Sequence, residues 1–276
     1  MSDTPYRENL AMDPSPDRAD EFANWLALPR DVTASILMRL EAFEILTSAQ
    51  MVCSPWHNLC KDPSMWRAVH MRKPFTLLGF PYDLEKMCRH AVGRSCGQLV
   101  NIHVENFGTD ELLRHIAESS SQLKHLRLVR CRGISNKGLS GVAAKLPLLE
   151  ELDISYCSLS KEALEAVGRC CPHLKSLKFN NSGQKYRVCD EEALAIAKYM
   201  SELRRLQLFG NKLTNDGLQA ILDGCPHLES LDLRQCFNVT LAGNLGRICA
   251  EQIKDLRHPH DSTYDYELEL VLLALI

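Results

Sequence analysis

Several absences narrow the function of this 276-residue chain before any motif is found. Its longest apolar run, from Val271 to Ile276, is far shorter than the roughly 20 residues of a membrane-spanning helix. Neither charge dominates, because 32 basic residues stand against 35 acidic ones, so nucleic acid and anionic membranes are not the expected partners. The first residues also lack the basic start and apolar core of a secretory signal. We therefore expect the protein in the nucleus, the cytoplasm or both.

Catalytic and metal-binding motifs are missing as well. The sequence contains no C-x2-C pair, no Gly-rich phosphate loop, no H-E-x-x-H and no G-x-S-x-G. His258 and His260 form a pair without a third ligand, which is typical of a loop. The twelve cysteines are expected to be free and mostly buried as small apolar residues. We expect no enzymatic activity, no metal and no cofactor.

What the sequence does contain is a repeat. The pattern L-x-x-L-x-L begins at residues 99, 123, 149, 174, 203 and 228, with a degenerate copy at 253, and the steps between these starts are 24, 26, 25, 29, 25 and 25 residues. Such steps are typical of leucine-rich repeats, each of which supplies one strand and one helix to a solenoid. Three residues after the last apolar position of a copy comes Cys131, Cys157, Ser182, Asn211 or Cys236, which predicts the cysteine-containing class of repeat.

The segments between the strands are predicted to be helices. Their apolar residues recur three positions apart and so share one helix face, as in Leu113 and Ile116 or Leu218 and Ile221. Pro172 and Pro226 follow two of these segments and are expected to end the helices. The fold class is therefore α/β, with a curved solenoid of about six to seven repeats.

The residues that alternate with the repeat leucines are the candidates for binding, because successive strand side chains point to opposite faces. They form a strip of mixed charge on the concave face, which is a plausible surface for a protein target; for any single residue, ordinary solvated surface is an equal interpretation. The step of 29 residues also contains an insertion whose tip is either a contact loop or a tolerated surface loop. The candidate target-binding residues are His103, His125, Arg127, Glu151, Asp153, Lys178, Arg205, Gln207 and Asp232 on the strip, and Lys185, Tyr186 and Arg187 in the insertion.

A second module precedes the repeats. Leu28-Pro29 is expected to open a helix that carries Val32, Ile36 and Leu40 on one face, and a second helical stretch is expected to run as far as Val52. Ser54-Pro55 and Asp62-Pro63 resemble an N-cap followed by proline in the first helical position. Since a segment of about forty residues cannot bury all of its apolar side chains, the surplus is expected to form an interface.

These residues resemble the F-box at the family's spacing, and the whole chain, over about residues 25 to 257, resembles plant F-box/leucine-rich-repeat proteins of the adaptor-interacting group. The resemblance implies that the F-box binds a Skp-type adaptor, and through it cullin and RING subunits, while the repeats hold a protein target for ubiquitination. Pro55 and His57 depart from the family pattern, and Pro55 is tolerable only if it begins a helix. By position, the implied adaptor contacts are Leu28, Pro29, Ile36, Leu37, Leu40, Val52, Cys53, Trp56 and Trp66; Trp56 and Trp66 could instead close the core of the module.

The expected organisation is a disordered segment at 1–22, the F-box at 23–71, a linker with the first repeat helix at 72–98, the repeats at 99–258 and an irregular tail at 259–276. The apolar end of the tail either caps the last repeat or forms an exposed hydrophobic tag. Two other functions remain open: a repeat scaffold that recruits no ligase, and, ranked third, a receptor that uses a small molecule as glue, which a short arc would enclose poorly.

Overall fold

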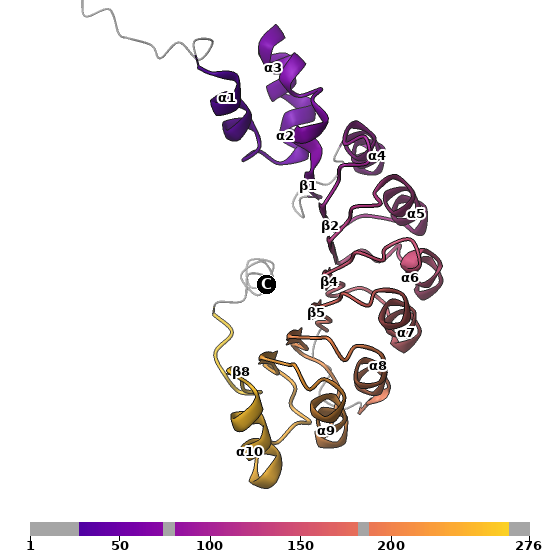
Figure 1. Cartoon of the computed structure of the whole chain (residues 1–276), viewed down its shortest axis with the longest axis vertical. Helices are drawn as coiled ribbons and strands as arrows, with labels where there is room; N and C mark the ends of the chain where they lie inside the picture. Colours follow the sequence, from indigo (N-terminus) through magenta and orange to yellow (C-terminus); the bar gives the residue numbers. More distant parts are fainter. Residues whose placement is uncertain (1–27, 74–80, 182–187, 265–276) are drawn as a thin grey trace, which may run out of the picture.

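The computed structural model describes residues 28–73, 81–181 and 188–264. In these ranges a small helical module leads into an arc in which an inner layer of strands is lined by an outer layer of helices (Figure 1). No helix in these ranges is both long and apolar enough to cross a membrane. The predicted disordered segment, the tip of the insertion and the end of the tail lie outside the described residues.

The helical module consists of α1 (Arg30–Leu37), α2 (Ala42–Thr47), η2 (Ala49–Met51), α3 (Ser54–Leu59) and η3 (Pro63–Trp66). Two helices are shorter than expected. Helix α1 ends at Leu37 because the next N–H groups form tighter turns, from Arg39 to Ile36 and from Leu40 to Leu37. The second stretch breaks at Ser48, where the backbone leaves the helical region.

The two predicted helix starts, each an N-cap residue followed by proline, are largely as expected. Asp62 caps η3 by accepting a hydrogen bond from the Ser64 N–H at 3.0 Å, with Pro63 in the first position. Cys53, and not Ser54, is the N-cap of α3, and its side chain makes no capping bond. Pro55 still lies in the first turn of α3, where its missing N–H is not needed. The departure from the family pattern at Pro55 therefore leaves the helix intact.

The repeats form a single eight-stranded parallel sheet in the order β1 to β8. Seven strands coincide with the expected copies, and an eighth, β1, precedes them, which the L-x-x-L-x-L search did not find. The strands are β1 (Ala68–Arg72), β2 (Asn101–Glu105), β3 (His125–Val129), β4 (Glu151–Asp153), β5 (Ser176–Lys178), β6 (Arg205–Gln207), β7 (Ser230–Asp232) and β8 (Asp255–Arg257). The helices between and beside them are α4 (Leu84–Arg94), α5 (Asp110–Ser119), α6 (Asn136–Ala143), α7 (Lys161–Cys170), α8 (Glu191–Tyr199), α9 (Asn215–Gly224) and α10 (Gly243–Gln252).

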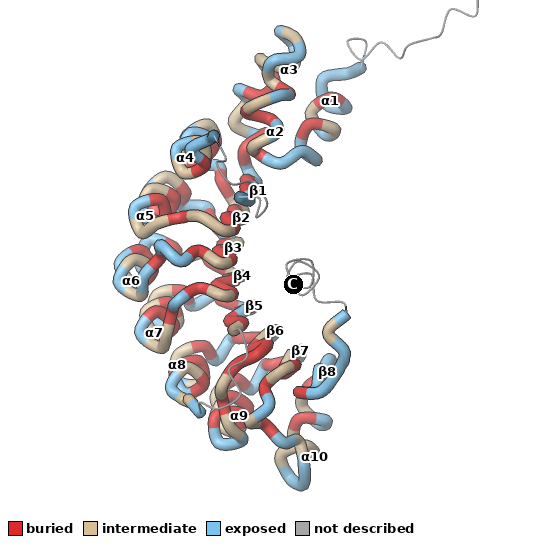
Figure 2. Tube along the Cα trace, turned by 180° about the vertical axis from the view of Figure 1, so that it is seen from behind, coloured by how far each residue is buried: buried red, intermediate tan, exposed pale blue. Residues whose placement is uncertain are grey.

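The core follows the repeat leucines. Ile102, Leu126, Leu152 and Leu177 are in register across β2 to β5 and are almost fully buried. The predicted helix-face pairs belong to the same buried cluster, and buried residues occur along both the strands and the helices of the arc (Figure 2). Helices α7 and α9 each end one residue before the Cys-Pro step, as predicted. The helices therefore close one side of the sheet and leave the other side for polar residues.

Five of the strands, β2, β3, β4, β6 and β7, leave the sheet through the same local structure. The residue two positions after the last repeat apolar residue has positive φ, between 55° and 65°, and its N–H donates a hydrogen bond to the next repeat. A residue with a β-carbon is disfavoured in this left-handed conformation by about 1–2 kcal/mol. Only one of the five positions is occupied by glycine. These residues are Asn106, Arg130, Tyr156, Gly210 and Gln235.

The repeat cysteines lie directly after this turn. The thiols of Cys131, Cys157 and Cys236 donate to the carbonyls of Val104, Leu128 and Leu208 in the preceding repeat, at 3.4, 3.3 and 2.9 Å. All twelve cysteines are free, and burial raises the pKa of Cys236 to about 12. The repeat cysteines thus join neighbouring repeats through their thiols.

Candidate functional site: two binding surfaces

The helical module exposes an apolar surface, here called the F-box patch. Met51 and Val52 are 74% and 62% exposed, and Met38 is 54% exposed. They lie in the turn after α1 and at the end of η2, where the chain has left a regular helix and no other described element covers it. The patch consists of the exposed apolar residues Leu28, Val32, Met38, Leu40, Met51 and Val52.

Beside the F-box patch is a hollow of about 260 Å³ between the start of α1 and α3. It is lined by Leu28, Thr33, Pro55 and Trp56, among others, and Arg30 at its edge forms an ion pair with Asp62 at 2.7 Å. Trp56 is half-buried, with part of its ring packed against the core. An apolar side chain from a partner would fit into this hollow against the indole.

The predicted adaptor residues divide into two groups. Leu28, Pro29, Leu40 and Val52 are exposed, and Ile36, Cys53 and Trp56 are half-buried. Leu37 and Trp66 are 0% and 1% exposed, so they belong to the core of the module and do not reach its surface. Sequence reasoning did not name Met38 and Met51, which the structure shows as exposed apolar residues after α1 and at the end of η2.

The predicted target-binding residues lie together on the concave face. Parallel register places His103 of β2 beside Arg127 of β3, then Asp153 of β4 and Lys178 of β5. In the neighbouring row, His125, Glu151, Ser176 and Arg205 follow one another in the same way. The alternation inferred from the sequence is therefore correct for the nine strip residues, whereas Lys185, Tyr186 and Arg187 lie outside the described residues.

Ion pairs cross the strip. The Glu151 carboxylate lies 3.1 Å from Nδ1 of His125 on one side and 2.5 Å from Nη2 of Arg205 on the other. The second pair reaches from β6 to β4 over β5, where Ser176 is nearly covered. Arg127 pairs with Asp153 at 3.1 Å. The Glu151–Arg205 pair thus forms a bar across the concave face.

The bar separates two hollows that share Glu151, Ser176 and Lys178. The first hollow, of about 240 Å³, extends over β1 to β5 and is lined by His70, Asn101, His103, His125, Arg127, Glu151, Asp153, Ser176 and Lys178. The second hollow, of about 480 Å³, extends over β4 to β8 and is lined by Glu151, Ser176, Lys178, Arg205, Gln207, Ser230, Asp232, Arg234, Asp255 and Arg257. Both are shallow and open to solvent.

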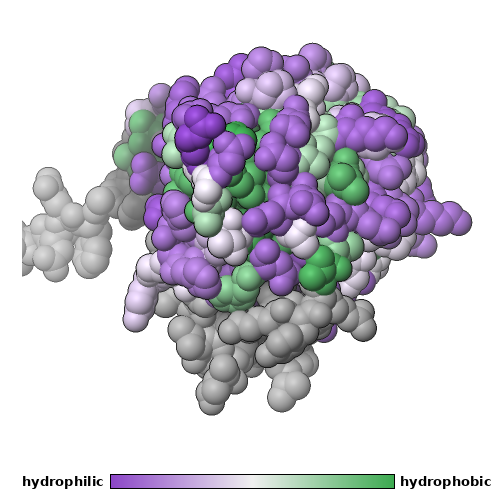
Figure 3. Space-filling model, turned by 90° about the horizontal axis from the view of Figure 1, so that it is seen from below, coloured by the Kyte–Doolittle hydropathy of each residue, from purple (hydrophilic) through white to green (hydrophobic). Residues whose placement is uncertain are grey.

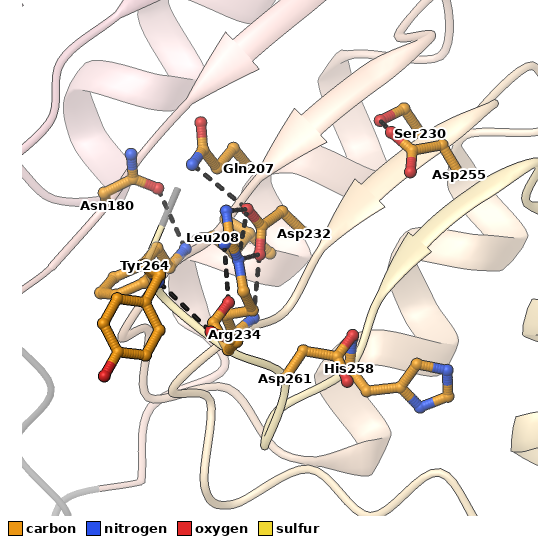
Figure 4. Close-up of polar contacts among 12 residues, drawn as sticks. Asn180, Gln207, Leu208, Ser230, Asp232, Arg234, Asp255, His258, Asp261 and Tyr264 are labelled. Atoms are coloured by element: carbon orange, nitrogen blue, oxygen red, sulfur yellow. Dashed lines mark hydrogen bonds and ion pairs between the residues drawn. The ribbon is translucent and has the colours of Figure 1, made fainter. Parts of the chain in front are cut away.

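The second hollow is organised around Arg234. Its guanidinium, 6% exposed, binds Asp232 at 2.8 Å and donates to the Ser262 carbonyl at 3.0 Å (Figure 4). Asp232 also accepts from Gln207 at 3.3 Å, and Ser230 donates to Asp255 at 3.0 Å. The chain after β8 is thereby fixed against the rim of β7. From this end of the arc, the surface is mainly hydrophilic with separate small apolar patches (Figure 3).

In the first hollow, His103 is the most perturbed group. Burial, with the charges of Arg127, His70 and Arg72, lowers the pKa of His103 to about 3, so the imidazole is neutral at neutral pH. Its Nε2 is buried and has no hydrogen-bond partner among the described residues; the nearest carboxylate oxygen, on Glu105, is 3.6 Å away, too far for a hydrogen bond. No cluster of three or more potential metal ligands occurs in the described ranges.

Comparison with known proteins agrees with this two-part architecture. The F-box-like family model matches residues 25–72, the model "FBD-associated F-box protein At5g56370, LRR repeats" matches 84–190, and a Leucine Rich repeat model matches 200–222. F-box protein SKIP19 of Arabidopsis thaliana is 51% identical over 92% of this chain and 83% of its own length. The chain belongs to the F-box/leucine-rich-repeat family.

Other relatives differ in length. Putative F-box/LRR-repeat protein 23 of Arabidopsis thaliana is 53% identical over 90% of this chain, which spans only 56% of that protein. Among solved structures, the leucine-rich repeat-containing protein LegL7 from Legionella pneumophila overlays with a TM-score of 0.47 at 11% identity, over 83% of this chain and 78% of that one.

In this F-box/leucine-rich-repeat protein, the two regions are joined through Trp66. Trp66, Val69 and Met71 have the spacing of L-x-x-L-x-L, and Val69 and Met71 are in register with Ile102 and Val104. The Trp66 indole donates to the Cys60 carbonyl at 2.8 Å, and Arg94 of α4 lies 5.4 Å from its ring. The tryptophan therefore ends the F-box and begins the first repeat, which is the signal that a search for leucines alone missed.

Proposed function

We propose that this chain is the substrate-recognition subunit of a cullin-RING ubiquitin ligase of the SCF type. In this proposal the F-box patch binds a Skp-type adaptor, which connects it to the cullin and RING subunits. The concave face then holds a protein target for ubiquitination in the nucleus, the cytoplasm or both. The chain itself carries no catalytic step.

The observation that carries the proposal is the F-box patch. Met51 and Val52 expose most of their surface, although each apolar side chain left in water forgoes about 1.5–3 kcal/mol of burial. Several large apolar side chains exposed within one small module are typical of a binding site for another protein. The half-buried Trp56 beside it supplies the kind of aromatic side chain that often dominates interface energy.

The test is a quantitative pull-down of a purified Skp-type adaptor by the full chain. A Met51→Asp/Val52→Asp double variant places two charges in the F-box patch without touching the core. We expect its affinity to fall at least about tenfold, with an unchanged circular dichroism spectrum and melting temperature. Leu194→Asp on α8 is the control, because Leu194 is an exposed apolar residue, at 54%, outside the F-box.

Two results would contradict the proposal. A folded wild-type chain that captures no adaptor would leave the repeat-scaffold function, in which the concave face binds a partner without recruiting a ligase. Equal capture by the wild type and the double variant would mean that the F-box patch is not the adaptor interface.

A further inference from the structure

The first hollow contains carboxylates, but both are already neutralised. Glu151 lies between His125 and Arg205. Asp153 accepts from the backbone and hydroxyl groups of Ser155 at 3.0 and 2.5 Å and pairs with Arg127. A basic ligand would therefore have to displace an existing cation from each carboxylate before it gained a new one.

Two hydrogen-bond donors of the first hollow, Lys178 and His103, have no such partner in the ranges that the structure describes. Lys178 is exposed, lines both hollows, and forms no ion pair within the described part of the chain. His103 has a buried Nε2 without a hydrogen-bond partner there. Burial is the largest cause of the lowered pKa of His103, and the charges of Arg127 and Arg72 lower it further. An unsatisfied buried polar atom costs about 1–3 kcal/mol, and a ligand with acceptor oxygens would recover part of that energy.

From this asymmetry we infer that the first hollow binds an extended acidic segment of a protein target, with one carboxylate at Lys178 and another at His103. The inference rests on the proposed function, since it names the class of target that the concave face receives. Charge complementarity selects this occupant: the free donors accept an anion, whereas the carboxylates have no capacity left for a cation.

The geometry also sets the spacing of the acidic residues. Lys178 and His103 occupy the same row on strands three steps apart, from β5 to β2, which corresponds to about 14 Å across the sheet. An extended chain rises about 3.3 Å per residue, so two acidic side chains about four residues apart match the two positions. The bar between Glu151 and Arg205 marks the far limit of this segment.

The experiment is selection from a phage-displayed library of random twelve-residue peptides on the immobilised full chain, without adaptor. We expect recovered peptides to be enriched in Asp and Glu, with pairs about four residues apart. The same enrichment is expected for Lys137→Glu, a matched reversal of an exposed lysine on the outer helix α6, but not for Lys178→Glu. By fluorescence anisotropy, a selected peptide should bind Lys178→Glu at least about tenfold more weakly than it binds the wild type.

Peptides without acidic enrichment, or equal enrichment with Lys178→Glu, would overturn the inference. Lys178→Gln separates charge from shape, because it should weaken binding less than the reversal does. Since the adaptor is absent, the outcome is independent of ligase assembly. Failure of adaptor capture together with selection of acidic peptides would contradict the proposed function alone, and the reverse result would contradict this inference alone.

Discussion

The F-box and the repeats use apolar residues in different ways. Between Leu28 and Val52 six large apolar side chains are exposed. From α4 to β8 only three large apolar side chains are exposed among the described residues, those of Val188, Leu194 and Phe237. The apolar residues of a repeat strand are covered by the neighbouring strands and by the helix layer. Those of the F-box have only three short α-helices and two 3-10 turns of the module to cover them. Exposed apolar surface is thus concentrated on the F-box module, where a partner protein could cover it.

Paired charged residues, by contrast, are concentrated on the concave face of the repeats. On the concave face, charged side chains from successive strands meet in register and form pairs such as Arg127 with Asp153. An exposed pair such as Arg205 with Glu151 contributes about 0–1 kcal/mol to stability, so it determines the charge pattern of the surface far more than it holds the fold. The F-box is therefore suited to a permanent apolar interface, and the strip to selective, charge-dependent recognition.

The sharpest test of this difference uses the two tryptophans. Trp66→Ala removes a buried ring and its hydrogen bond to Cys60, and we expect the free energy of unfolding to fall by about 3–5 kcal/mol. Trp56→Ala should cost less, because part of that ring is already in contact with solvent, but should reduce adaptor binding more strongly. Urea denaturation measures the first effect and adaptor capture the second. Equal destabilisation by both variants would contradict the assignment of Trp66 to the core and of Trp56 to the interface.

Much of this arrangement could be predicted from the sequence. The L-x-x-L-x-L spacing determines which residues are buried, and strand alternation then places His103, Arg127 and Lys178 on one face without further information. Strand β1 was missed because Trp66, Val69 and Met71 stand where leucines were sought. The spacing was present, but the residue types differed from the pattern.

Other features depend on side-chain reach and on local backbone energies that spacing does not contain. The pairing of Glu151 with Arg205 skips a strand, since it needs a long arginine side chain over a small residue, Ser176. The end of α1 at Leu37 follows from tighter hydrogen bonds in the next turn, and this early end is what exposes Met38 and Leu40. The residues predicted as adaptor contacts consequently include two that are buried in the core, Leu37 and Trp66, and omit two exposed methionines, Met38 and Met51.

A smaller effect, on pH dependence, probes the polar strip. The pKa of His103 in the folded chain is about 3, below the usual 6.5 of the unfolded chain. At pH 7 both states are neutral. As the pH falls below 6.5, only the unfolded state gains the proton, so stability decreases and continues to decrease towards pH 3.

The groups that face His103 are His70 and Arg72 of β1, Glu105 of its own strand and Arg127 of β3. His103→Gln should remove this loss, so that the wild type becomes less stable relative to the variant by about 2 kcal/mol between pH 7 and 5. Comparing the two chains cancels the titration of the shared carboxylates. A stability difference that stays constant over this range would show that His103 protonates normally.

The smallest expected effect concerns the outer helices, whose inner faces are packed and whose outer faces are open. Gly141 lies within α6, and a β-carbon there would have no atom within 4 Å. Gly141→Ala should therefore raise the free energy of unfolding by about 0.5–1 kcal/mol, because glycine loses more backbone entropy in a helix. At Gly224, at the end of α9, a β-carbon would lie 2.2 Å from the Ala197 carbonyl oxygen, so the same substitution should destabilise. Urea midpoints of the two variants should shift in opposite directions, and a shift in the same direction would mean that helix spacing in the array adjusts to the added methyl group.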